Sequence, residues 1–134
     1  MKIERQVVSS EPALRLKEFG VKQDSIFWWG EASDGEVGIY LREDVEKSAE
    51  EFDGIVGINW ICSAFAVAEL GLLLPDKVCW RGYVHTGKIW FFSFGDGVDL
   101  GFTASAETEA DMRAKMLIYL LEKKLITIHE IHEN

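Results

Sequence analysis

Residues 108–124, TEADMRAKMLIYLLEKK, decide the fold class, because they predict a long helix that must be covered on two sides. Thr108 followed by Asp111 matches a capping box, and the early acids complement the positive end of the helix dipole. At 100° per residue the apolar side chains divide into two stripes. The first stripe contains Ala110, Ala114, Leu117, Leu121 and Leu125, and the second contains Met112, Met116, Tyr119 and Leu120. One small sheet can cover only one side of a helix, and the first stripe suits that side. We therefore expect the second stripe to pack against a helix at 64–74 or a second copy of the chain.

Strand signals occupy two regions upstream of this helix. Residues 26–32 and 37–41 predict a hairpin, because Asp34-Gly35 between them readily supplies the positive φ of a tight turn. A meander of three more strands is expected at 78–84, 89–94 and 98–103. The middle strand of the meander is apolar on both faces apart from Ser93, which is typical of a central strand.

Two further helices are expected. The first covers 11–19, with Ser10 as its N-cap and Gly20 as the residue that ends it. The second covers 64–74, with Ser63 as its N-cap.

The remaining segments give weaker signals. Residues 43–53 predict a short amphipathic helix, and residues 125–131 predict a strand that returns to the sheet edge. Glu69, the only charge within 64–74, is expected to point out of the core. The chain is therefore predicted to form one α+β domain over residues 1–134. A mostly antiparallel sheet of about five strands, from the hairpin 26–41 and the meander 78–103, would pack with helices 11–19, 64–74 and 108–124.

Composition excludes several classes of partner. The 14 basic and 23 acidic residues give a net charge of −9, and no basic stripe is present that could neutralise nucleic-acid phosphates. The uncharged run 54–68 ends at Glu69 and is too short to span a membrane, so a buried helix is the simpler interpretation. Two cysteines, Cys62 and Cys79, fit neither a zinc site nor a disulfide framework. Without an apolar leader, a cytoplasmic location with both thiols reduced is expected.

No catalytic, cofactor or metal motif is found. His129 and His132 with neighbouring glutamates resemble metal ligands, but such terminal clusters are usually solvated. Asp96 and Asp99 lie in a glycine turn that lacks the further acids of a calcium loop and the lysine of a phosphate loop. His85 lies at a predicted hairpin tip, where a turn residue is the simpler interpretation. No catalytic residue, cofactor or metal is therefore assigned.

The aromatic residues are the most informative feature, with five Trp, eight Phe and three Tyr. Neighbouring residues of a strand point to opposite faces, so these aromatic clusters cannot all form one core. They either fill a sheet covered by helices on both sides or form an exposed groove or partner interface, where Trp and Tyr are enriched. The candidate ligand- or partner-binding residues are Trp28, Trp29, Trp80, Tyr83, His85 and Trp90.

Three segments also carry a resemblance. Residues 16–25 (LKEFGVKQDS), 68–71 (AELG) before Pro75, and 108–121 (TEADMRAKMLIYLL) resemble a family of small uncharacterised bacterial proteins, often encoded on prophages or other mobile elements. The last segment is the most specific. The resemblance implies a bacterial accessory protein and carries no catalytic residue over to this chain.

These observations favour a non-catalytic accessory or interaction protein. Its partner would be a second copy of the chain, as a homodimer, or an unknown protein. Neither nucleic acid nor a membrane is expected. The alternative is an enzyme or a small-ligand-binding protein with an aromatic-lined pocket. Its polar groups would come from His85, Asp96, Asp99 or Glu69, and they would have to converge in one pocket.

Overall fold

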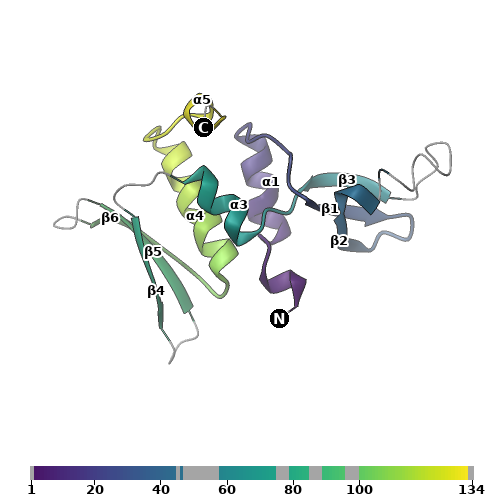
Figure 1. Ribbon diagram of the computed structural model, residues 1–134, viewed down its shortest axis with the longest axis horizontal. Helices are drawn as coiled ribbons and strands as arrows, with labels where there is room; N and C mark the ends of the chain where they lie inside the picture. Colours follow the sequence, from purple (N-terminus) through teal and green to yellow (C-terminus); the bar gives the residue numbers. More distant parts are fainter. Residues whose placement is uncertain are drawn as a thin grey trace.

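The protein combines helices with antiparallel sheet, as the sequence predicts (Figure 1). The computed structural model describes residues 2–44, 46, 58–74, 79–84, 89–95 and 100–132, and only the backbone at 79–84, 89–95 and 100–103. Its helices are η1 (Ile3–Arg5), α1 (Ser10–Glu18), α3 (Val67–Leu73), α4 (Glu109–Glu122) and α5 (Ile128–His132). Its strands are β1 (Phe27–Ala32), β2 (Val37–Leu41), β3 (Ile58–Ser63), β4 (Cys79–Val84), β5 (Ile89–Gly95) and β6 (Leu100–Ala106).

The described strands form two sheets. One has the order β2-β1-β3 and the other the order β4-β5-β6, with every neighbouring pair antiparallel. A single sheet of about five strands is therefore not confirmed. Figure 1 shows the two sheets on opposite sides of the helices, with α1, α3 and α4 between them. The hairpin and the meander are each closed by local turns, and nothing in the local sequence determines that the helices separate them.

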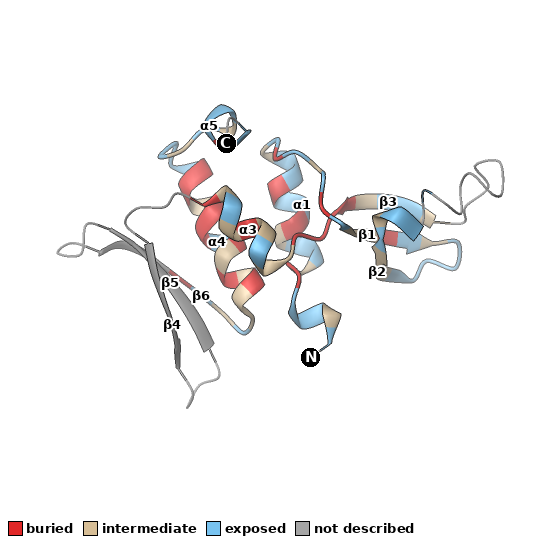
Figure 2. Cartoon of the chain, in the orientation of Figure 1, coloured by how far each residue is buried: buried red, intermediate tan, exposed pale blue. Residues whose placement is uncertain are grey.

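The core lies among the helices. α4 contacts α1, α3, β5 and β6, so it is covered on more than one side, as its two apolar stripes require. Seven of its side chains are buried, namely Ala110, Met112, Ala114, Met116, Leu117, Leu120 and Leu121. Leu16 from α1 and Leu70 from α3 complete the same buried cluster. Figure 2 shows the buried residues concentrated on α1 and α4. The contact with α1 was not predicted. Leu125 of the first stripe is 50% exposed.

Local signals place several boundaries correctly. Thr108 Oγ1 accepts the Asp111 N–H, which confirms the predicted N-cap of α4. Gly20 ends α1 with a φ of +94°, and Gly35 in the hairpin turn has a φ of +86°; both are left-handed conformations that favour glycine. The N-cap of α1 is Ser9 instead of the expected Ser10.

The helix predicted at 64–74 begins late, because Ser63 belongs to β3. The Ser63 N–H donates to Gln23 Oε1, and Ser63 Oγ accepts the Ser25 N–H. This serine therefore bonds to the residues before β1 and does not cap α3. The N-cap of α3 is Ala66, whose N–H donates to Glu69 Oε1 at 2.8 Å.

The expectation that Glu69 points away from the core is wrong. Its carboxylate also accepts the Ser25 hydroxyl at 2.7 Å and the Ile26 N–H at 3.3 Å. Glu69 is half-buried, and its hydrogen bonds connect the start of α3 to the residues that lead into β1.

The strand predicted at 125–131 is also wrong, because the chain forms α5 there. Thr127 Oγ1 accepts the Glu130 N–H and also contacts Glu130 Oε1, which is the pattern of a helix start. Of the predicted helix 43–53, residues 43, 44 and 46 are helical, and the rest lies outside the described residues.

Candidate functional site

The register of the β2-β1-β3 sheet gathers aromatic side chains on one of its faces. Trp28 of β1 lies opposite Tyr40 of β2, and Gly30 lies opposite Trp60 of β3. Directly opposed residues share a face, so Trp28, Tyr40 and Trp60 lie on the same side. The ring centroids of Trp28 and Trp60 are 4.9 Å apart with their planes at 59°, a tilted pair. Trp60 remains 37% exposed, so this group of aromatic side chains reaches solvent.

Gly30 lets the side chains of Tyr40 and Ile58 pack directly against the backbone of the sheet. A Cβ at this position would lie 2.8 Å from Ile58 Cγ2 and 3.2 Å from Tyr40 Cδ2. Both side chains therefore lie directly over the Gly30 backbone, which is buried although the rings around it are not. A β-bulge between Trp29 and Gly30 accompanies this arrangement.

Arg42 places a cation beside these aromatic rings. Its guanidinium lies 5.9 Å from the centroid of the Trp28 ring, within the range of a cation–π contact, and its Nε pairs with Glu46 at 3.0 Å. The Trp28 indole donates to the Ser25 carbonyl at 3.0 Å, which fixes the ring. We call Trp28, Tyr40, Arg42 and Trp60 the aromatic face. Trp, Tyr and Arg are the residue types that contribute most binding energy in protein interfaces.

The six residues predicted from the sequence do not form one site. Trp28 belongs to the aromatic face, whereas Trp29 lies on the other face, donates to the Val8 carbonyl at 2.9 Å and packs on the helical core. Trp80, Tyr83 and Trp90 lie in the β4-β5-β6 sheet, where the backbone pairs Tyr83 with Trp90. His85 lies outside the described residues.

Sequence reasoning missed Trp60, Tyr40 and Arg42 as site residues. Trp60 carried a usable signal: Ile58, Asn59 and Trp60 alternate between apolar and polar, as in a half-exposed strand. The uncharged run around them instead suggested a buried helix.

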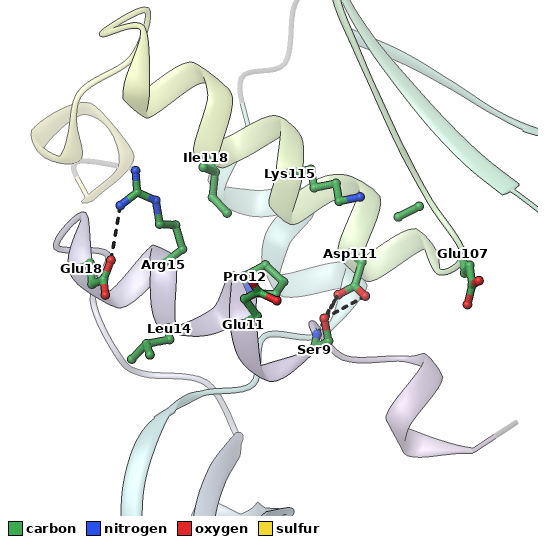
Figure 3. A pocket seen from close by; sticks show the side chains of 11 residues that line it. Ser9, Glu11, Pro12, Leu14, Arg15, Glu18, Glu107, Asp111, Lys115 and Ile118 are labelled. Atoms are coloured by element: carbon green, nitrogen blue, oxygen red, sulfur yellow. Dashed lines mark hydrogen bonds and ion pairs between the residues drawn. The ribbon is translucent and has the colours of Figure 1, made fainter.

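A second candidate is the groove between α1 and the start of α4, with a volume of about 770 Å³ (Figure 3). Pro12, Leu14 and Ile118 give it apolar walls, and charged side chains surround them. Most polar groups already have partners within the chain. Ser9 donates from its N–H and its hydroxyl to the Asp111 carboxylate at 2.7–3.0 Å.

The basic residues of the groove are also engaged. Arg15 pairs with Glu18 and Glu122, which raises the pKa of its guanidinium, and Lys115 donates to the Ser105 carbonyl. None of the lining residues is a histidine or a cysteine, so the groove lacks a nucleophile with a neighbouring imidazole base.

Metal and thiol chemistry have no support in the part of the chain that the structure describes. No group of three or more His, Cys, Asp or Glu there could hold a metal ion. Cys62 is buried, and burial raises the pKa of its thiol to about 11, so it is protonated at neutral pH. Cys62 therefore behaves as a core residue. Of the two terminal histidines, His132 has a structural contact, because its Nε2 accepts the Lys22 N–H at 3.0 Å.

The comparisons with known proteins add no family. No protein-family model matches the sequence, and comparison with curated proteins and with solved structures finds no similar protein. Within the described ranges, no helix is long and apolar enough to cross a lipid bilayer.

Proposed function

We propose that this protein works by binding another protein on its aromatic face and catalyses no reaction. The carrying observation is the tilted Trp28–Trp60 pair, which stands beside Tyr40 and Arg42 with Trp60 37% exposed. A ring pair in the centre of a domain would be covered on all sides. An interface anchor needs a rigid, partly desolvated ring that a partner can finish burying.

The charge of the segment that carries Trp28, Tyr40 and Arg42 indicates the kind of partner. Residues 26–46 contain six acidic side chains and one basic one, Arg42. Such a surface attracts a partner with basic residues and repels nucleic-acid phosphates. The proposed partner is therefore a protein whose contact surface offers apolar and basic side chains. An accessory role for a bacterial protein from a prophage or another mobile element, suggested by the sequence resemblance, is compatible with this mode of action.

The alternative of a small-ligand or enzyme pocket has less support. Of its four polar candidates, Glu69 is occupied by the Ser25 hydroxyl and two backbone N–H groups. His85, Asp96 and Asp99 lie outside the described residues. The groove between α1 and α4 carries none of the aromatic residues that this alternative requires.

Binding should depend on Trp60 far more than on other exposed apolar residues. Proteins captured from the host by the wild type would be purified, and their affinity would be measured by calorimetry for the wild type, Trp60→Ala and Leu72→Ala. Leu72 is the matched control, because it is 82% exposed on α3, away from the aromatic face. Loss of a central anchor costs about 2 kcal/mol or more, so Trp60→Ala should weaken binding at least about tenfold. Equal affinity for all three proteins would contradict the proposal.

A further inference from the structure

We propose that two copies of this chain associate through the outer edge of β2, which joins their β2-β1-β3 sheets into one six-stranded sheet. β2 is an edge strand, and among the described residues no strand pairs with its outer side. Natural edges are usually protected by lysine, proline or a bulge. Val37-Gly38-Ile39-Tyr40-Leu41 has none of these, and its pairing with β1 is regular throughout. The edge shares Tyr40 and Arg42 with the aromatic face but binds through backbone groups, so different variants test the two proposals: Ile39→Pro for the dimer and Trp60→Ala for the partner.

The hydrogen bonds of the hairpin show which backbone groups face outward. The Ala32 N–H donates to the Glu36 carbonyl, and the Arg42 N–H donates to the Ile26 carbonyl. In an antiparallel pair, hydrogen-bonded positions recur at every second residue. The even-numbered residues of β2 therefore bond to β1. The N–H and C=O groups of Val37, Ile39 and Leu41 point to the open edge.

One register satisfies all of these outward groups. If the two β2 strands run antiparallel about a twofold axis at Ile39, Ile39 faces Ile39 of the second copy and Val37 faces Leu41 of the second copy. Each of these pairs falls on hydrogen-bonding positions of both strands. A shift by one residue would bring an outward residue opposite an inward one, and a shift by two would leave an outward residue without a partner in β2.

The same register pairs opposite charges at both ends of the strand. Glu36 faces Arg42 of the second copy, and Arg42 faces Glu36 of the second copy. Glu36 has no ion-pair partner within the described chain, and opposed charges at such cross-strand positions are favourable.

Apolar contacts accompany the backbone pairing. Val37 and Leu41, which are 46% and 45% exposed, would cover each other across the twofold axis. On the other face, Tyr40 would lie opposite Gly38 of the second copy. Acidic residues elsewhere in 26–46 make the two copies repel at long range, and physiological salt screens this repulsion beyond about 8 Å.

Sedimentation velocity from low to high micromolar concentration at physiological salt tests the interface. The wild type should shift with concentration from the monomer to twice the mass of the chain. Ile39→Pro removes an N–H that points outward and leaves the bonds to β1 in place, so it should weaken the dimer at least about tenfold through two lost hydrogen bonds. Leu72→Ala, which removes an exposed apolar side chain elsewhere, should dimerise like the wild type.

A charge swap tests the register without relying on the fold of the proline variant. Glu36→Arg places two arginines opposite each other and should weaken the dimer, whereas the double variant Glu36→Arg/Arg42→Glu should restore it. A wild type that stays monomeric at every concentration would overturn the proposal. So would a dimer that neither Ile39→Pro nor Glu36→Arg weakens, because the interface would then lie elsewhere.

Discussion

Helix α4 and the β1-β2 hairpin are both rich in apolar residues but use them differently. Seven of the fourteen residues of α4 are buried. In β1 and β2 only Gly30 is buried, and Val37 and Leu41 are more than two-fifths exposed. Burial of apolar area is the main source of folding free energy. We therefore expect the helices to supply most of the stability, while the exposed apolar and aromatic side chains of the hairpin can contact a partner.

Leu120→Ala should have the largest effect on stability. Leu120 is fully buried among the helices, and truncating such a side chain costs about 2–5 kcal/mol because a cavity is left behind. Urea unfolding followed by circular dichroism measures this loss. Glu122→Ala, in the same helix with an exposed carboxylate, should leave the melting temperature nearly unchanged. A Leu120→Ala variant as stable as Glu122→Ala would show that the helices do not form the stabilising core.

Glu69→Gln should cost about 1–3 kcal/mol, because the charged acceptor of two N–H groups and one hydroxyl is replaced by an amide. The loss should appear in urea unfolding. Amide hydrogen exchange would show where it acts, with increased exchange at Ile26 and at the first turn of α3. A neutral Glu69→Gln variant would mean that this carboxylate does not link the helical core to the hairpin.

The buried thiol of Cys62 should make stability depend on pH above pH 9. Its pKa rises from an ordinary value of 9.0 to about 11 on folding, so only the unfolded chain ionises between these values. The stability is fully present below pH 9 and should fall by up to about 1.4 kcal/mol per pH unit toward pH 11. Cys62→Ser, which does not ionise in this range, is the control. Identical pH dependence of the two proteins would contradict a buried thiol.

Trp60→Ala should lower the free energy of unfolding by about 1–2 kcal/mol, less than Leu120→Ala despite the larger side chain. The ring is 37% exposed and contacts Trp28 at the surface of the sheet, so its removal leaves no enclosed cavity. Thermal unfolding monitored by circular dichroism suffices to check this. A loss comparable to that of Leu120→Ala would place Trp60 in the core and remove the contrast between the two regions.

The parts of the fold that the sequence predicts well are those with local signals. The N-cap Thr108 and the apolar period define α4, and Asp34-Gly35 closes the hairpin. β3 was missed because it pairs with β1, about thirty residues earlier in the chain, and its uncharged sequence fits a helix equally well. The same failure hid Trp60 of the candidate site, whereas Tyr40 and Arg42 were missed although the hairpin that carries them was predicted. The start of α5 was missed because alternating apolar residues outweighed the Thr127–Glu130 cap.

Amide hydrogen exchange at two protein concentrations tests most directly whether the helices supply stability and the hairpin supplies association. The backbone amides of Leu117 and Leu120 should be among the slowest to exchange, at rates independent of concentration. The outward amides of Val37, Ile39 and Leu41 should exchange slowly in concentrated protein and faster on dilution, whereas Gly38 and Tyr40, which bond to β1, should change little. Outward amides that exchange at the same rate at both concentrations, or an α4 that exchanges as fast as β2, would contradict the account.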